Sequence, residues 1–152
     1  MKTDGLNTSA QPLRVLVIDD DEGGRDTLRI MFEDQGVNVL TTDDGNDGLA
    51  LCKTNQVDLV ITDIFMPTKS GGETISELRQ CQPGIRIIAV SGGGQVGGSS
   101  VLKLAKQWGA DEVIQKPFDF DEMTLLVRAL LPGRSVTADG ARPGEHDTGG
   151  SR

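Results

Sequence analysis

The chain has 152 residues, enough for one domain with an ordinary hydrophobic core. Its formal net charge of -8 and pI near 4.5 argue against binding to nucleic acid or to an anionic membrane surface, because both need a basic surface. No apolar stretch is long enough for a signal peptide or a bilayer span, so we expect a cytoplasmic protein.

Five apolar, β-branched runs predict five strands. In chain order, they are residues 15–18, 37–40, 57–61, 85–90 and 113–114. Between the runs, apolar residues recur at helical spacing and predict helices that alternate with the strands. These helical residues are Leu28, Met31 and Phe32; Ile75 and Leu78; Val101, Leu104, Ala105 and Trp108; and Met123, Leu126, Val127 and Leu130.

Breaking and capping residues lie between these segments. Gly36 and Gly109 are predicted to follow helices, and residues 82–84 are predicted to form a turn. Asp43 and Asp119 are predicted helix N-caps.

Alternating strands and helices indicate an α/β fold with helices on both faces of a parallel sheet. Right-handed crossovers favour a doubly wound five-stranded sheet of the flavodoxin-like (βα)5 type, with strand order 2-1-3-4-5. We expect one domain over residues 13–132 and no second domain. The polar segments 1–12 and 133–152 are predicted to be disordered, because they have too few apolar residues to offset the entropy of ordering.

Acidic residues follow two of the predicted strands. Residues 19–21 are three aspartates after the first strand, and Asp63 follows the third. In the expected topology both ends meet where the winding direction reverses, which is where such sheets bind ligands. Carboxylates about 4 Å apart repel by roughly 4 kcal/mol per pair at an effective dielectric near 20, so a cation or a proton is expected there. Taken alone, residues 19–21 fit a solvated loop or helix cap equally well.

Other chemistry-bearing residues narrow the choice of site. Ser91 and Lys116 also follow predicted strands, whereas the single histidine, His146, lies in a glycine-rich tail. A histidine-based hydrolase or zinc site is therefore excluded. An all-oxygen site suits Mg²⁺ or Mn²⁺. Cys52 and Cys81 have no metal-binding spacing and are expected to be reduced, partly buried thiols.

Four motifs in order resemble those of the response regulator receiver domain, the CheY-like module of two-component signalling. They are the acidic pair Asp19-Asp20, the run D-x-x-M-P-x-x-x-G from Asp63 to Gly71, Ser91, and Lys116-Pro117-Phe118. The resemblance covers about residues 13–131, and the strand order expected above rests partly on it.

The resemblance implies a role for each acid. Asp63 is the expected phosphoacceptor, taking a phosphoryl group from phosphohistidine on a sensor histidine kinase or a histidine phosphotransfer protein. Asp20 and Asp63 are expected to ligate Mg²⁺ directly, with Asp19 acting mainly through water. Phe65 is expected to contribute its backbone carbonyl to the same ion.

The resemblance also implies a switch. Lys116 is expected to pair with Asp63 and then with the phosphate, after a cis peptide bond to Pro117. Ser91 is expected to hydrogen-bond the phosphate and draw its loop inward. Many receivers carry an aromatic switch residue where this chain has Val113, so any signal must travel by loop and helix shifts. The glycine-rich segment 91–100 suits either a mobile switch loop or an ordinary connection.

The expected function is that of a single-domain response regulator that signals by phosphorylation-dependent protein binding or phosphorelay. It is not expected to be a turnover enzyme. The expected partner face includes Lys103, Gln107, Val113 and Arg128, and Trp108 is interpreted as core packing. Two alternatives stay open: a small Mg²⁺-dependent phosphatase with an aspartate nucleophile, and a receiver-like module that binds proteins without phosphorylation.

Overall fold

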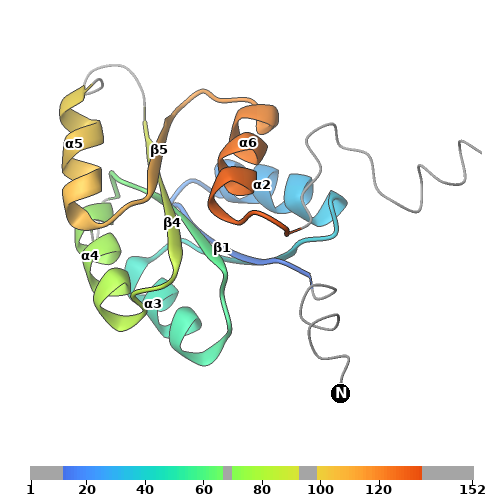
Figure 1. Cartoon of the computed structure of the whole chain (residues 1–152), viewed down its shortest axis with the longest axis horizontal. Coiled ribbons are helices and arrows are strands. Elements are labelled where there is room, and N and C mark those ends of the chain that lie inside the picture. Colours follow the sequence, from blue (N-terminus) through green and yellow to red (C-terminus); the bar gives the residue numbers. More distant parts are fainter. Residues whose placement is uncertain (1–11, 67–69, 93–98, 135–152) are drawn as a thin grey trace, which may run out of the picture.

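The structure is a computed structural model that describes residues 12–66, 70–92 and 99–134. Strands and helices alternate through this part of the chain, as predicted (Figure 1). The elements are β1 (Arg14–Ile18), α2 (Glu22–Asp34), β2 (Asn38–Thr42), α3 (Gly45–Thr54), β3 (Leu59–Asp63), α4 (Gly71–Cys81), β4 (Arg86–Ser91), α5 (Ser99–Trp108), β5 (Glu112–Gln115) and α6 (Phe120–Leu130).

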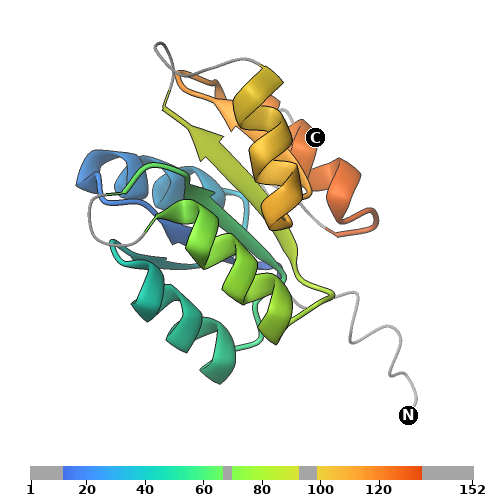
Figure 2. The same ribbon diagram turned by 90° about the vertical axis from the view of Figure 1, so that its left-hand side faces the viewer.

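The five strands form one parallel sheet in the order β2-β1-β3-β4-β5, which confirms the predicted topology. Helices α2 and α6 cover one face, and α3, α4 and α5 cover the other (Figures 1 and 2). The winding direction reverses between β1 and β3, so their carboxyl ends lie side by side.

Side chains alternate along each strand and build a core on each face of the sheet. Val15 and Val17 pack with α2 and α6, whereas Leu16 and Ile18 pack with α3, α4 and α5. Because β1, β3 and β4 are buried on both faces, their sequences are continuous apolar runs rather than alternating ones.

Two predicted core residues are exposed instead. Met31 in α2 and Leu104 in α5 are 38% and 46% exposed, while Phe32 and Ala105 beside them are fully buried. In both helices, the stripe of apolar residues that is buried is narrower than the stripe of apolar residues in the sequence. Trp108 is half-buried against the α3–α5 core, as predicted.

The helix boundaries follow capping chemistry, with one correction. The N-cap of α3 is Asp44 rather than Asp43, and its carboxylate accepts the N–H groups of Asn46 and Asp47. Asp119 caps α6 in a reciprocal capping box with Glu122, which confirms that prediction. Gly36 and Gly109 follow helices with φ of 81° and 121°, values that disfavour a side chain.

The two cysteines differ in environment. Cys52 is buried, and burial raises its pKa to about 11, whereas Cys81 is exposed, contrary to the prediction of partial burial.

No helix in the described ranges has both the length and the apolar character needed to cross a bilayer.

Charged residues at the amino edge of the sheet are tightly hydrogen-bonded. The Arg79 guanidinium donates to the carbonyls of Pro83, Ile85 and Gly109 and to the Asp111 carboxylate, at 2.6–3.1 Å. Asp111 also accepts the N–H of Ile87 at 2.8 Å. These bonds join α4, β4 and the segment before β5.

A second group of hydrogen bonds lies at the same edge. Asp58 accepts the N–H of Arg14 at 2.9 Å and pairs with the Arg134 guanidinium through both carboxylate oxygens. Arg134 also donates to the carbonyl of Pro12 at 3.5 Å. The two ends of the described domain are therefore held together.

Candidate phosphoacceptor and metal site

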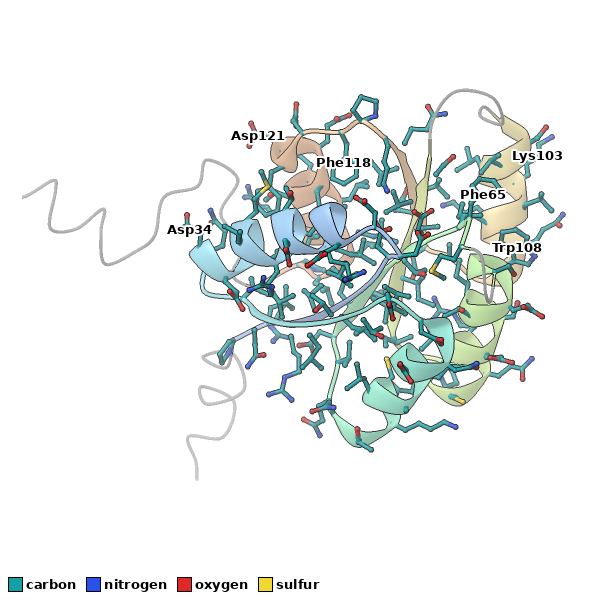
Figure 3. All side chains as sticks on the ribbon, turned by 180° about the vertical axis from the view of Figure 1, so that it is seen from behind. Asp34, Phe65, Lys103, Trp108, Phe118 and Asp121 are labelled. Carbon is teal, nitrogen blue, oxygen red and sulfur yellow. The ribbon has the colours of Figure 1, made fainter. Side chains whose placement is uncertain are left out.

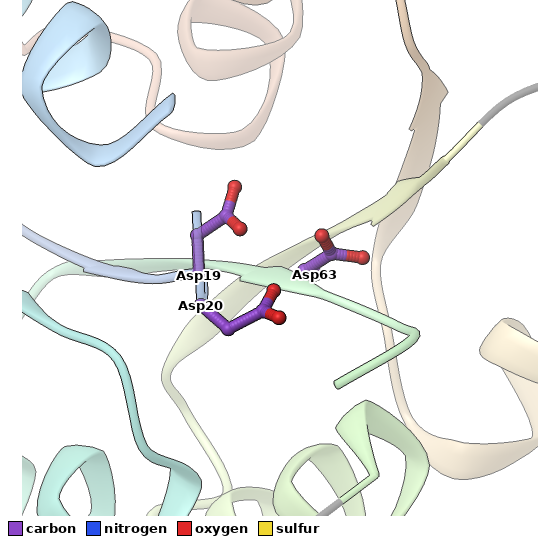
Figure 4. A group of neighbouring side chains, drawn as sticks. All are labelled: Asp19, Asp20 and Asp63. Atoms are coloured by element: carbon purple, nitrogen blue, oxygen red, sulfur yellow. The ribbon is translucent and has the colours of Figure 1, made fainter. Parts of the chain in front are cut away.

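The predicted acids meet at the carboxyl edge of the sheet. Asp63 is the last residue of β3, and Asp19 follows β1 directly. Ile18 of β1 pairs with Thr62 of β3. The residues that follow them, Asp19 and Asp63, therefore lie next to each other at the carboxyl edge of the sheet. Single carboxylate oxygens of Asp19, Asp20 and Asp63 all lie within 4.8 Å of one another (Figure 4).

Backbone contacts hold Asp19 in place. Its N–H donates to the carbonyl of Thr42 at 3.1 Å, and its carbonyl accepts from the Arg25 guanidinium at 2.8 Å. The next turn is closed by Asp21, whose side chain caps α2 by accepting the N–H of Gly24. The helix-cap interpretation of residues 19–21 thus holds for Asp21 only.

Lys116 lies between two of the carboxylates. Its ammonium group donates to Asp19 at 3.2 Å and to Asp63 at 3.3 Å. Burial alone lowers the pKa of Lys116, but the charges of Asp19 and Asp63 outweigh burial and raise that pKa. The peptide bond from Lys116 to Pro117 is cis, as the family resemblance implied.

Asp63 is a buried carboxylate with little hydrogen bonding. Burial raises the pKa of Asp63, and the nearby charge of Asp19 raises it further. The hydrogen bond from the N–H of Phe65, at 3.1 Å, and the charge of Lys116 lower this pKa but do not outweigh burial. The side chain of Phe65 is 51% exposed. An acid in this environment gains from any cation that neutralises it.

The donor set fits a hard divalent cation. Asp19, Asp20 and Asp63 offer only carboxylate oxygens, and no histidine or cysteine belongs to the cluster. Asp20 is exposed, so its carboxylate can turn toward an ion without losing a buried partner. These features suit Mg²⁺ or Mn²⁺. The predicted role of the Phe65 carbonyl stays a prediction.

Ser91 ends β4 and is buried, but its hydroxyl has no hydrogen-bond partner in the described structure. It lines a pocket of about 240 Å³ with Val101, Val113 and others, away from the acids. The N–H of Lys116 donates to the Ser91 carbonyl at 2.8 Å, which joins the two residues through the backbone. In this state the Ser91 hydroxyl makes no hydrogen bond to Asp63 or to the acidic pair.

Comparison with known proteins decides the family. The model of the response regulator receiver domain matches residues 15–128. The chain belongs to this family. Receiver domains generally bind Mg²⁺ and interact with histidine kinases, which agrees with the acidic cluster at residues 19, 20 and 63.

Curated relatives are longer proteins. The cell cycle transcriptional regulator CtrA of Caulobacter vibrioides is 34% identical over 119 residues, which are 78% of this chain and 50% of CtrA. The transcriptional regulatory protein CpxR of Klebsiella pneumoniae is 36% identical over 118 residues, 78% of this chain and 49% of CpxR. The chain therefore spans about half the length of these relatives.

Solved structures agree on the fold. Chemotaxis protein CheY4 of Vibrio cholerae superposes with a TM-score of 0.74 at 24% identity, over 80% of this chain and all of CheY4. A receiver domain protein from Clostridium thermocellum gives 0.71 at 28% identity, over 78% and 94% of the two chains.

Two contributors to this receiver site were missed in the sequence. Gly71 lies against the backbone of Asp63 and Ile64, and a side chain there would overlap both. Its N–H donates to the Ile64 carbonyl at 2.8 Å, so α4 begins directly beside the end of β3. The run D-x-x-M-P-x-x-x-G includes Gly71, but the sequence alone does not show why a glycine is needed at that position. Nothing in the sequence signalled the contact between Arg25 and Asp19.

Some predictions cannot be checked against the described part of the receiver domain. Residues 1–11, 67–69, 93–98 and 135–152 lie outside it, which includes most of the glycine-rich segment and His146. On the predicted partner face, Lys103, Gln107 and Arg128 are exposed and Val113 is half-buried.

Proposed function

We propose that Asp63 accepts a phosphoryl group in a divalent-cation-dependent reaction, and that the phosphorylated receiver signals by binding proteins or by onward transfer. The observation that carries this proposal is a buried carboxylate with a raised pKa, between an acidic pair and a lysine. The proposed donor is phosphohistidine on a sensor kinase or a phosphotransfer protein.

The chemistry follows from these positions. An Asp63 oxygen attacks phosphorus, the bond to the donor histidine breaks, and its electron pair leaves with the imidazole. Asp19, Asp20 and Asp63 would hold Mg²⁺, which supplies charge neutralisation for the phosphoryl oxygens. Lys116, already within 3.3 Å of Asp63, supplies a second positive charge. The product is an acyl phosphate on the protein, and we propose that the reaction is stoichiometric, with one phosphoryl group accepted per chain.

Ser91 gives this proposal a means of switching. A buried hydroxyl without a partner costs about 1–3 kcal/mol. A phosphoryl group on Asp63 offers acceptor oxygens, so turning Ser91 toward it would remove that cost. Phosphorylation would thereby favour a different arrangement of the segment after β4, without an aromatic residue at position 113.

The proposed partners are proteins. The net charge of -8 disfavours contact of this receiver with a phosphate backbone. CtrA and CpxR are named as transcriptional regulators, and this role describes those two proteins and not this chain.

The test is intact mass after incubation with acetyl phosphate or phosphoramidate and Mg²⁺. We expect one added phosphoryl group, absent without Mg²⁺ and absent in Asp63→Asn. Asp121→Asn, an exposed acid in α6, is the matched control and should be phosphorylated normally.

Other outcomes favour the alternatives. Absence of an adduct together with failure to bind beryllofluoride would favour the phosphorylation-independent module. Multiple turnovers of a simple phosphate ester would favour the phosphatase.

A further inference from the structure

A cleft of about 460 Å³ begins at the acid site and continues between α2 and the segment after β5. Asp19, Asp63 and Lys116 line its polar end. The other end is apolar, and the residues there are Val17, Leu28, Ile61, Val90 and Phe118. Thr27 lines the cleft and is exposed, so it lies at the rim.

The apolar end is formed by two elements above the sheet. Leu28 comes from α2, and Phe118, which Figure 3 labels near α2 and α6, comes from the segment after the cis peptide bond. Both belong to the core on this face of the sheet, yet both still line the cleft. An apolar ligand group could therefore extend this core.

The size and chemistry of the cleft exceed what phosphorylation needs. A phosphoryl group requires the cation at one end, and nothing in that reaction requires an adjoining apolar compartment. A volume of about 460 Å³ lies in the range of small-molecule sites, which combine apolar walls with a few polar groups. The matching ligand has a phosphoryl anion at one end and an apolar group at the other.

We propose that this cleft is a subsite for an aromatic or branched apolar group attached to a phosphoryl group, so that aryl acyl phosphates are better donors than acetyl phosphate. This inference rests on the proposed function. In the step, an Asp63 oxygen forms a bond to phosphorus and the bond between phosphorus and the acyl oxygen breaks. The electron pair leaves with the released carboxylate, and no proton or redox partner is needed.

The expected preference is moderate. Covering a phenyl ring against Leu28 and Phe118 removes apolar surface from water, and partial burial corresponds to about a tenfold gain in affinity. The gain should appear in the half-saturating donor concentration, because the ring contacts the cleft before and during transfer.

The first test uses unreactive ligands, so it does not depend on phosphorylation. With Mg²⁺ present, phenylphosphonate and methylphosphonate are titrated while the methyl resonances of Leu28, Val17 and Val90 are followed by NMR. We expect phenylphosphonate to shift them with about tenfold higher affinity. Equal affinities, or shifts confined to residues around Asp63, would overturn the subsite.

The second test compares benzoyl phosphate with acetyl phosphate by intact mass. Thr27→Phe should obstruct the rim and remove the benzoyl preference, so that the benzoyl rate falls more than the acetyl rate; Thr27→Ser is the matched control. Circular dichroism checks that both variants fold. Equal half-saturating concentrations for the two donors in the unsubstituted protein would overturn the inference.

The two proposals can fail separately. Phosphorylation by acetyl phosphate without a benzoyl preference retains the phosphoacceptor and removes the subsite. No phosphorylation by either donor, with selective phenylphosphonate binding, removes the phosphoacceptor and retains the subsite.

Discussion

The two edges of the sheet hold their charges in opposite ways. At the amino edge, the Arg79 guanidinium reaches three carbonyl groups and Asp111, and Asp58 is paired through both oxygens. At the carboxyl edge, Asp63 has a raised pKa and the Ser91 hydroxyl has no partner among the described residues. The charged groups named at the amino edge are each held by several hydrogen bonds, whereas the carboxyl edge keeps a buried hydroxyl that a ligand could bond.

This contrast locates stability and function in different places. Groups at a binding site must stay incompletely satisfied, because a ligand can stabilise only what the protein has left unbonded. The loss in stability at that edge has to be offset elsewhere in the same small domain. Removing a polar side chain at the amino edge should therefore lower stability, whereas removing one at the carboxyl edge should chiefly affect the response to a phosphoryl group.

The largest expected loss of stability is at the amino edge. Arg79→Leu would leave three carbonyl groups without this donor, and Asp111 would keep only the N–H of Ile87 and a 3.5 Å contact with Arg86. The free energy of unfolding should therefore fall by about 3 kcal/mol. Urea denaturation measures this change. Arg86→Leu is the matched control: its guanidinium is 46% exposed and makes one 3.5 Å contact with Asp111, so a loss below about 1 kcal/mol is expected. Equal losses would refute the contrast.

A smaller loss of stability is expected where α4 meets the end of β3. In Gly71→Ala the new side chain would overlap the backbone of Asp63 and Ile64, which should cost about 2 kcal/mol and slow phosphorylation. Thermal unfolding and the rate of mass gain report the two effects. Gly84→Ala, where the added carbon meets nothing within 4 Å, should be neutral or slightly stabilising. An unchanged phosphorylation rate in Gly71→Ala would show that α4 does not position Asp63.

Ser91→Ala should have the reverse effect on stability. Removing a buried hydroxyl without a partner should leave the unliganded protein equally stable or about 1 kcal/mol more stable. Stabilisation by beryllofluoride should then be smaller by a similar amount, because the variant cannot form the new hydrogen bond. Differential scanning fluorimetry with and without beryllofluoride measures both quantities, and Ser76→Ala in α4 is the control. A full stabilisation by beryllofluoride in Ser91→Ala would exclude the proposed switch.

The last prediction concerns the thiols, and at neutral pH it leaves stability unchanged. Burial raises the pKa of Cys52 from its ordinary value of 9.0 to about 11, so at pH 8 iodoacetamide should modify only the exposed Cys81. The unfolded chain loses the Cys52 proton at lower pH than the folded one. The free energy of unfolding should therefore be unaffected below pH 9 and fall as the pH rises from 9 to about 11. Mass spectrometry of Cys81→Ser at pH 8 gives the check, and rapid modification of that variant would contradict it.

The fold was predictable because its signals are local. Strands β1, β3 and β4 are continuous β-branched runs, and the carboxyl ends of β1 and β3 carry Asp19 and Asp63. The expected strand order, which rests partly on the family resemblance, therefore already placed these two acids together. Helical spacing predicted which residues could face the core, but not how much of each helix surface the adjacent elements cover. Met31 was assigned to the core wrongly for that reason. Asp43 and Asp44 are both able to cap a helix, and only packing selects one.

The remaining features of the site depend on the approach of separate elements. The overlap that excludes a side chain at Gly71 arises only when α4 meets the end of β3. Likewise, the residue type at position 91 predicts a hydroxyl but not its environment, and in the structure this hydroxyl is buried without a hydrogen-bond partner. The cleft beside α2 has no motif at all, because Leu28 and Phe118 are 90 residues apart and meet only in the folded chain.

The pairing of Arg134 with Asp58 and Pro12 has a practical consequence for engineering. It brings the first and last residues of the described domain together at the edge opposite the acids. A short peptide joining these two points would allow the chain to be reopened at another surface turn, such as Pro83-Gly84. Likewise, a fusion partner attached at either point would lie at the edge opposite the acids.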